Sequence, residues 1–232
     1  MRRLPQYIAT LKHGGWQQSG LKTTAMPPNF GLGLTLRGRN LGIWGYGKVG
    51  QLVAGVGRAF GMNVIVWGSE ASRQKARSDG FASATSAEAF FSTCDVLTLH
   101  LRLRDETRGL VTSQLLSMMK PAAVFVNTSR AELVEPDALI SALNRGRPGM
   151  AAVDVYETEP VLQGQALLRL ENCICTPHIG YLHSGFEKLG EDLDFNQYVT
   201  IVDRMNYISP IANETAWFNS VEKLMNIELM PR

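Results

Sequence analysis

The chain has 232 residues, of which 45% are hydrophobic and 19% are charged, values typical of a globular protein with a sizeable core. Its 23 basic and 21 acidic residues give a formal net charge of +2, which provides no reason to expect a nucleic acid or an anionic membrane as partner. No apolar run approaches the length of a membrane span, and the first residues lack the apolar core of a secretion signal. We therefore expect a cytoplasmic protein with no membrane partner.

Residues 1–30 are predicted to hold a first helix, over residues 1–13, and a linker rich in Gly, Pro and polar residues. Residues 31–185 then alternate between short apolar strands and segments with helical spacing. After Gly185 the pattern weakens, and residues 186–232 are predicted to form a helical tail whose arrangement the sequence does not define.

The predicted strands of the central region are short and rich in Val, Ile, Leu, Phe and Ala. We expect them at residues 40–45, 63–68, 95–101, 122–127, 149–155 and 172–177. Helices are expected between them at residues 48–61, 71–80, 86–93, 112–120 and 135–146. Near-continuous apolar strands that alternate with helices predict a parallel sheet covered on both faces. The expected fold class is α/β, a doubly wound, three-layer sheet of the Rossmann type, which binds dinucleotides.

A glycine-rich turn follows the first of these strands. Gly45, Gly47 and Gly50, with Lys48 and Val49 before the last of them, match the pattern G-x-G-x-x-G. The first glycine allows the turn, the second lets the backbone approach a pyrophosphate, and the third lets helix and strand pack closely. The helix that starts here offers N–H groups and a partial positive charge to phosphates. A tight turn without a ligand also uses glycine, but strand, glycines and helix together favour a dinucleotide site.

The end of the second strand bears on the choice between NAD and NADP. NAD sites commonly carry Asp or Glu here to bind the ribose 2′-OH, whereas this strand ends in Gly68. Ser69, Arg73 and Lys75 could accommodate a 2′-phosphate, and Glu70 could oppose it or reach the ribose itself. The last four could equally be solvated loop residues, so the sequence leaves NAD and NADP open.

Polar residues also follow the later strands, at the carboxyl edge where ligands bind in open α/β sheets. Several of them are candidates for contact with the cofactor or the substrate. These candidates are His100, Leu101, Arg102, Thr128, Ser129, Arg130, Asp154, Glu159, His178 and Gly180.

Arg130, Glu159 and His178 have the chemistry that reduction of a 2-oxo acid requires. Hydride transfer to a ketone carbon needs a proton for the oxygen, and histidine titrates in the right range to provide it. A carboxylate such as Glu159 favours the charged imidazole and orients the ring. Arg130 could hold the substrate carboxylate through two parallel hydrogen bonds, and Asp154 is placed to contact the nicotinamide carboxamide. Each residue alone is more often structural, but together beside a glycine turn they favour catalysis.

The three cysteines, Cys94, Cys173 and Cys175, suit a reducing compartment. Cys173 and Cys175 alternate along one predicted strand, so their side chains point to the same face. A disulfide or a metal site would need more ligands nearby, so the sequence predicts buried, unreactive thiols and no metal.

Five motifs, in order, make the chain resemble the D-isomer-specific 2-hydroxyacid dehydrogenases, the family that includes D-3-phosphoglycerate dehydrogenase. They extend over residues 1–185 and are LRGRNLGIWGYGKVG, LHLRLRDETRGLV, MMKPAAVFVNTSRAELV, GMAAVDVYETEP and TPHIGY. The resemblance implies that the catalytic arginine, glutamate and histidine are Arg130, Glu159 and His178, and that Asp154 binds the carboxamide. It also implies NAD or NADP as cofactor, a 2-oxo or 2-hydroxy acid as substrate, and a homodimer.

The chain departs from the family pattern in two respects. Gly68 stands where members often carry Asp. The family also has a substrate domain before the nucleotide domain, whereas this sequence starts at the helix that leads into the latter, so we expect weak or no turnover from the chain alone. Two functions are open: an NAD(P)-dependent oxidoreductase that interconverts a 2-oxo acid and a D-2-hydroxy acid, and a non-catalytic nucleotide-binding and dimerisation module similar to the corepressors of this fold.

Overall fold

The computed structural model of the chain describes Ile8, Leu11, Lys12 and residues 34–180. The predicted linker and the predicted tail over residues 186–232 lie outside these residues, as does most of the predicted first helix. The described part therefore coincides with most of the predicted dinucleotide-binding domain.

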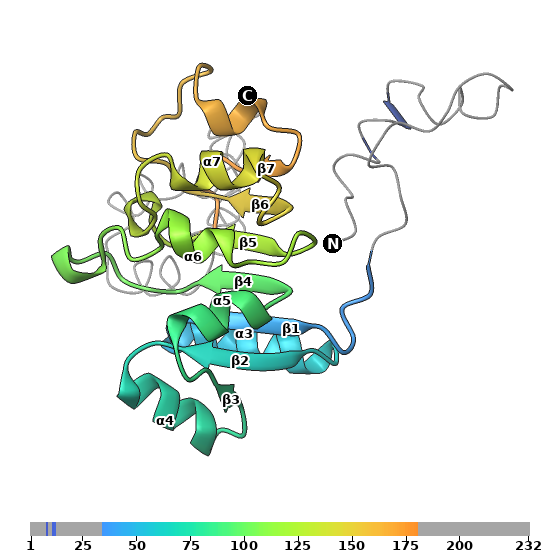
Figure 1. The fold of residues 1–232 in the computed structure, drawn as a ribbon, viewed down its shortest axis with the longest axis vertical. Helices are drawn as coiled ribbons and strands as arrows, with labels where there is room; N and C mark the ends of the chain where they lie inside the picture. Colours follow the sequence, from blue (N-terminus) through green and yellow to red (C-terminus); the bar gives the residue numbers. More distant parts are fainter. Residues whose placement is uncertain (1–7, 9–10, 13–33, 181–232) are drawn as a thin grey trace, which may run out of the picture.

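Seven parallel strands form one sheet, in the order β3-β2-β1-β4-β5-β6-β7 (Figure 1). The strands are β1 (Asn40–Trp44), β2 (Asn63–Trp67), β3 (Ala82–Ser83), β4 (Val96–Leu99), β5 (Val124–Asn127), β6 (Met150–Val153) and β7 (Cys173–Cys175). The chain runs outward from β1 to β3 and then returns to the other side of β1 at β4. This reversal creates a topological switch point between β1 and β4, the position at which ligands bind in such sheets.

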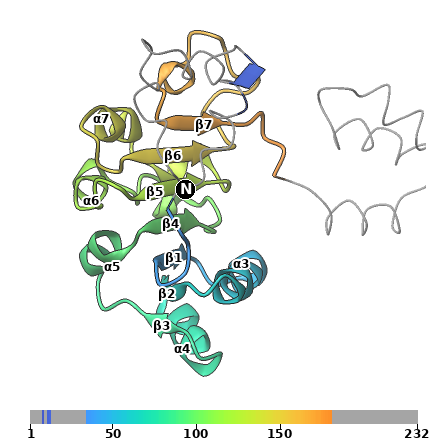
Figure 2. The same cartoon turned by 90° about the vertical axis from the view of Figure 1, so that its right-hand side faces the viewer.

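The helices cover both faces of the sheet, with α3 and α4 on one side and α5, α6 and α7 on the other (Figure 2). They are α3 (Lys48–Ala59), α4 (Glu70–Ser78), α5 (Ala87–Thr93), α6 (Ser113–Ser117) and α7 (Ala138–Asn144), and the short 3-10 helices are η1 (Asp105–Thr107), η2 (Ala131–Leu133) and η3 (Ala166–Arg169). These layers confirm the predicted doubly wound, three-layer α/β fold. Within the described residues, no helix combines the length and the apolar character of a membrane span.

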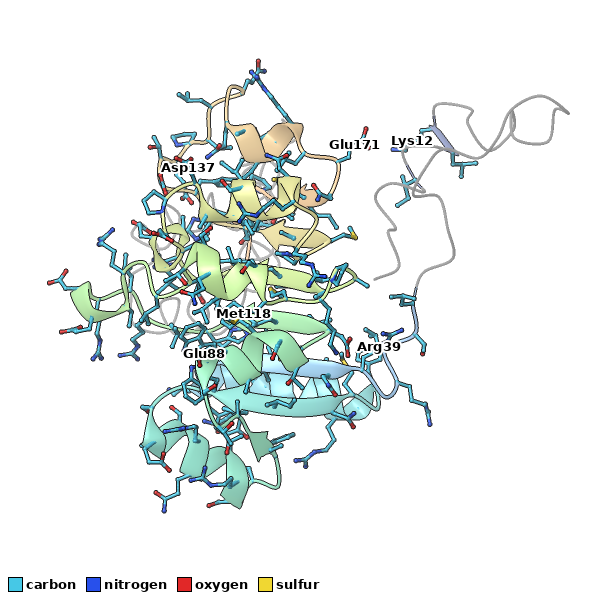
Figure 3. The ribbon with its side chains drawn as sticks, in the orientation of Figure 1. Lys12, Arg39, Glu88, Met118, Asp137 and Glu171 are labelled. Carbon is cyan, nitrogen blue, oxygen red and sulfur yellow. The ribbon has the colours of Figure 1, made fainter. Side chains whose placement is uncertain are left out.

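Because all strands are parallel, their carboxyl ends lie on one side of the molecule. Arg39, which directly precedes β1, and Glu171, which lies two residues before β7, are on the same side in Figure 3. Asp137, which lies beyond β5, is on the opposite side, and this is the edge at which the sequence predicts the site.

The helix starts differ in a way that matters for the site. Ser69, Ser86 and Thr112 begin α4, α5 and α6, and each side chain accepts a hydrogen bond from a backbone N–H of the first turn. By contrast, α3 starts at Gly47, which has no side chain with which to cap the helix. Its first turn therefore keeps the N–H groups that a bound phosphate would satisfy.

The core holds the strand ends in place. Phe90 and Phe91 of α5, Phe125 of β5 and Leu97 of β4 have no exposed surface. Burial of a side chain of this size stabilises the fold by about 1.5–3 kcal/mol. The carboxyl ends of the central strands are therefore fixed relative to one another, which a preorganised site requires.

Candidate active site

The glycine turn packs at the switch point between β1 and β4. Gly45 has a φ of +102°, and a Cβ atom placed on it would lie 2.6 Å from the backbone oxygen of His100. A Cβ on Gly50 would lie 2.2 Å from the oxygen of Gly45, so α3 approaches β1 as only glycine allows. At Gly47, no atom lies within 4 Å of such a Cβ. The close contacts and the open space both fit a turn that cradles a dinucleotide, and contact of these residues with the cofactor stays a prediction.

The residues after β4, His100 and Leu101, pack against the glycine turn from the other side of the switch point. His100 donates its backbone N–H to the oxygen of Trp44, at 2.8 Å, and its ring Nε2 lies 3.2 Å from the hydroxyl of Thr98. Burial lowers the pKa of His100 to about 4, so the ring is neutral at pH 7. Leu101 also approaches the glycine turn, whereas the side chain of Arg102 is exposed.

The end of β2 lies beside the same turn. Gly68 has a φ of +149°, and a Cβ placed on it would lie 3.7 Å from the nitrogen of Gly45. Next along the chain, Ser69 caps α4 by accepting a hydrogen bond from the N–H of Ser72, at 3.3 Å. Gly68, with Ser69 directly after it, is therefore placed next to the glycine turn, at the strand end that bears on the choice between NAD and NADP.

The charged residues of α4 are paired among themselves. The Glu70 carboxylate lies 2.7 Å from the guanidinium groups of both Arg73 and Arg77. Arg73 also lies over the ring of Trp67, with 4.7 Å between the guanidinium carbon and the ring centroid, which keeps it at the end of β2. A positively charged guanidinium group, that of Arg73, therefore lies at the strand end that leads into Gly68.

The turn after β5 presents Arg130. The side chain of Asn127, which is 2% exposed, accepts a hydrogen bond from the N–H of Ser129 at 3.0 Å and donates to the oxygen of Arg130 at 2.8 Å. The hydroxyl of Ser129 donates to the oxygen of Leu99, at 2.7 Å, which ties the turn to β4. Thr128 is exposed at the tip. Sequence reasoning missed Asn127, although an Asn at the start of a turn is a recognisable signal for such bonds.

Asp154 anchors the loop that carries His178. This carboxylate is 3% exposed, and it accepts hydrogen bonds from the N–H of Ile179 at 3.0 Å and of Gly180 at 2.7 Å. The hydroxyl of Thr176 also donates to it. Since a carboxylate has about four acceptor positions, most of its capacity is used within the chain. The predicted carboxamide contact stays a prediction, and the anchoring role was missed.

His178 and Glu159 form a close pair at the same edge. The Nδ1 atom of His178 lies 2.6 Å from the Oε2 atom of Glu159, whose Oε1 atom accepts the N–H of Tyr156 at 3.0 Å. His178 has a φ of +52°, a conformation that is uncommon for residues other than glycine and that concentrates at functional sites.

The charge state of Glu159 follows from opposing effects. Burial raises its pKa, but the hydrogen bond with His178, the N–H of Tyr156 and the positive charges of His178 and Arg130 together hold that pKa below its ordinary value of 4.5. Glu159 is therefore an ionised carboxylate at neutral pH. Two of the predicted catalytic residues, Glu159 and His178, are in direct contact, and Arg130 lies near enough for its charge to act on Glu159.

The cysteines divide into two kinds. Cys94 is buried, which confirms the prediction of burial there, and burial raises the pKa of its thiol to about 12. Cys173 and Cys175 are only partly buried, so the prediction of burial was wrong for them. The reason is their place on β7, which has a neighbouring strand on one side only among the described strands.

Two further features define the limits of the site. A cavity of about 100 Å³ lies between the ends of β5 and β6 and helix α7, lined by Asn127, Tyr156 and Asp137 among others. Neither His178 nor the glycine turn lines it, so it lies beside the candidate site. Among the described residues, no group of three or more His, Cys, Asp or Glu side chains has an arrangement that could hold a metal ion.

Comparison with known proteins decides the family. Residues 1–180 match the D-isomer-specific 2-hydroxyacid dehydrogenase, NAD-binding domain. The chain belongs to this family. The NAD-binding domain of the family supports NAD or NADP as the cofactor.

Individual relatives of this dehydrogenase family give the same result. The chain is 38% identical over 177 residues to glyoxylate reductase from Aeropyrum pernix, which covers 76% of this chain and 52% of that protein. It is 35% identical over 179 residues to D-3-phosphoglycerate dehydrogenase from Methanocaldococcus jannaschii, covering 77% of this chain and 32% of that protein. The chain thus spans about half of the first relative and a third of the second.

A solved structure supports the same fold and family. The crystal structure of phosphoglycerate oxidoreductase from Vibrio cholerae O395 is 54% identical to this chain and superimposes with a TM-score of 0.71. The match covers 79% of this chain and 56% of that one.

Proposed function

We propose that the chain carries the cofactor-binding and proton-transfer part of an NAD(P)-dependent oxidoreductase that interconverts a 2-oxo acid and a D-2-hydroxy acid. The observation that supports this best is the His178–Glu159 pair, with 2.6 Å between Nδ1 and Oε2, at the sheet edge that also holds the glycine turn. A reduced nicotinamide cofactor supplies a hydride when bound. The relatives named glyoxylate reductase and hydroxypyruvate reductase indicate small 2-oxo acids as the substrate class.

The residues then have separate roles. Glu159 binds Nδ1 of His178, which leaves proton transfer to the substrate oxygen to Nε2 of the same ring. The ionised Glu159 stabilises the charged imidazole before the proton is given up. Arg130 is proposed to bind the substrate carboxylate through its planar guanidinium group and so to place the carbonyl oxygen beside His178.

The test is oxidation of NADH and of NADPH, followed by absorbance, with glyoxylate, hydroxypyruvate, pyruvate or phenylpyruvate. His178→Asn should lower turnover about 100-fold or more and leave cofactor affinity unchanged, because general acid catalysis is lost while the glycine turn is intact. Asn is chosen because it tolerates the left-handed conformation at this position. Glu171→Gln, an exposed change at the opposite edge of the sheet, is the matched control and should have no effect.

The same experiment distinguishes the oxidoreductase from the alternative function, a non-catalytic nucleotide-binding module. A non-catalytic nucleotide-binding module would bind the cofactor, as measured by fluorescence titration, and show no turnover with any of these acids. His178→Asn would then change nothing, and the enzymatic proposal would be wrong for this chain.

For the cofactor, we infer a preference for NADP over NAD. Gly68 provides no carboxylate for the ribose 2′-OH, and Arg73 is held at the end of β2 by Trp67. The Nε atom of Arg73 is buried and has no hydrogen-bond partner among the described residues.

Fluorescence titration tests this preference. NADPH should bind more tightly than NADH, and Arg73→Gln should weaken NADPH binding about tenfold with little effect on NADH, since one charge-assisted hydrogen bond is lost. Arg145→Gln is the control, because Arg145 is exposed at the end of α7, on the other face of the sheet from α4. Tighter binding of NADH by the unchanged chain would contradict the inference.

We also propose that the chain forms a homodimer through helix α3. Its cytoplasmic location stays a prediction. Val49, Leu52, Val56 and Phe60 follow one another at helical spacing at α3, and each is more than half exposed. A contiguous apolar row of this kind is typical of a protein interface. Sedimentation equilibrium should show a dimer that Leu52→Lys dissociates, and a monomeric unchanged chain would contradict the proposal.

A further inference from the structure

Cys173 and Cys175 form a thiol pair on β7 that the proposed reaction does not use. Their Sγ atoms lie 3.8 Å apart, because alternate side chains of a strand point to the same face. The Sγ atom of Cys175 also lies 3.7 Å from the backbone oxygen of Leu167 in η3. Both side chains are only partly buried, since among the described strands β7 pairs with β6 alone.

The two thiols differ in acidity. The hydrogen bond between them lowers the pKa of Cys175 to about 7, against the opposing effect of burial. The same hydrogen bond raises the pKa of Cys173. A thiolate is the nucleophilic form of cysteine, so the pair combines one nucleophile with one neighbouring thiol.

A chain of hydrogen bonds joins this pair to the candidate active site. Tyr156 donates its hydroxyl to the oxygen of Thr176, at 3.0 Å, and its backbone N–H to Glu159, at 3.0 Å. Glu159 in turn holds Nδ1 of His178, at 2.6 Å. Thr176 directly follows Cys175. A change in the strand at Cys175 therefore moves the oxygen that accepts the hydrogen bond of the Tyr156 hydroxyl.

We propose that Cys173 and Cys175 are a redox modification site, at which a hydroperoxide forms an intramolecular disulfide that displaces the residues holding His178. The Cys175 thiolate attacks the outer oxygen of the hydroperoxide, the O–O bond breaks, and an alcohol leaves after taking a proton. Cys175 is thereby oxidised to a sulfenic acid. The sulfur of Cys173 then attacks that of Cys175, the S–O bond breaks, and water leaves with the thiol proton.

The geometry explains why this bond would act at a distance. The two sulfur atoms must move from 3.8 Å apart to about 2.05 Å. In an extended strand, Cα atoms two residues apart are about 6.6 Å from each other, near the upper limit of about 6.8 Å for a disulfide. The strand therefore contracts at Ile174 and moves Thr176. Formation of the disulfide does not depend on the proposed function. Its effect on turnover rests on that function.

The reduced 232-residue chain is treated with stoichiometric hydrogen peroxide, and its thiols are titrated after denaturation. We expect titratable thiols to fall from three to one, and the intact mass to fall by two hydrogens with no oxygen added. Phenylarsine oxide, a trivalent arsenical that binds two close thiols, should bind once per chain and prevent the oxidation. Cys94→Ala should form the same disulfide, with its titratable thiols falling from two to none, whereas Cys173→Ser and Cys175→Ser should each abolish the disulfide.

Coupling to the site is read from the His178 ring resonance in histidine-labelled protein, assigned by its loss in His178→Asn. The resonance should shift on oxidation and return with dithiothreitol, and any turnover should fall at least about tenfold and recover. Failure to form the intramolecular disulfide would overturn the site, and a disulfide that leaves the resonance unmoved would overturn the coupling. A chain without turnover still gives both readouts, so failure of the proposed function is distinguishable.

Discussion

The two halves of the candidate site are built from different groups. Around β1 and α3 the site consists of backbone: Gly45 and Gly50 pack against carbonyl oxygens, and α3 begins without a side-chain cap. Around β6 and β7 it consists of side chains, in which Asp154 accepts three hydrogen bonds and Glu159 binds His178. Added volume should therefore damage the first half, whereas removal of a charge or an acceptor should damage the second.

The largest effect is expected from Gly50→Ala. The new Cβ would lie 2.2 Å from the backbone oxygen of Gly45, which cannot move without moving the end of β1. We expect a loss of about 2–3 kcal/mol in the free energy of unfolding, measured in urea, together with loss of cofactor binding. Gly47→Ala is the matched control, because no atom lies within 4 Å of its Cβ, and it should change stability by less than about 0.5 kcal/mol. Equal destabilisation by both changes would mean that the close approach to the Gly45 oxygen does not limit the volume allowed at Gly50.

A smaller effect is expected from Asp154→Asn on the side-chain half. The new amide keeps one acceptor oxygen, but its NH2 group would face the N–H of Ile179 or Gly180. The unsatisfied buried donors should cost about 2 kcal/mol, seen as a lower thermal midpoint, and turnover should fall because the His178 loop is released. Asp105→Asn, at an exposed position, should leave both unchanged. Wild-type stability of Asp154→Asn would mean that the loop has another anchor.

The smallest effect concerns Glu159, and it depends on pH. Since its pKa is lowered on folding, ionised Glu159 stabilises the fold above its ordinary value of 4.5, and the contribution is lost as pH falls through the lowered value. The free energy of unfolding should exceed that of Glu159→Gln by about 1 kcal/mol or less near pH 7, because both partners are partly exposed. The two proteins should converge on acidification below pH 4.5. A gap that widens with acid would contradict the assigned ion pair.

Much of the fold follows from local patterns in the sequence. The apolar strands that were predicted, such as residues 63–68 and 122–127, contain β2 and β5, because burial on both faces of a parallel sheet imposes a continuous apolar run. The strand β3 was missed, since Ala82–Ser83 has two residues and no such run. The placement of Glu159 and His178 at one edge was predictable, because parallel strands bring their carboxyl ends together.

The rest depends on contacts between distant residues, which leave no local pattern. Asp154 was expected to face the cofactor, yet the N–H groups of Ile179 and Gly180, 25 and 26 residues later, use its oxygens. The role of Tyr156 in joining Thr176 to Glu159 has the same origin. The exposure of Cys173 and Cys175 depends on β7 being an edge strand, which a strand pattern alone does not indicate.

The strand order has a consequence for folding. The switch point joins β1 to β4, and residues paired there are far apart in the chain, as in the hydrogen bond between Asn40 and Asp95, with a separation of 55 residues. The neighbouring strands β1 and β2 are separated by a much shorter segment. Closure of longer loops costs more entropy, and contacts of high sequence separation form slowly. We therefore expect the nucleotide crevice to assemble last, so that recovery of cofactor fluorescence lags behind recovery of far-UV circular dichroism during refolding.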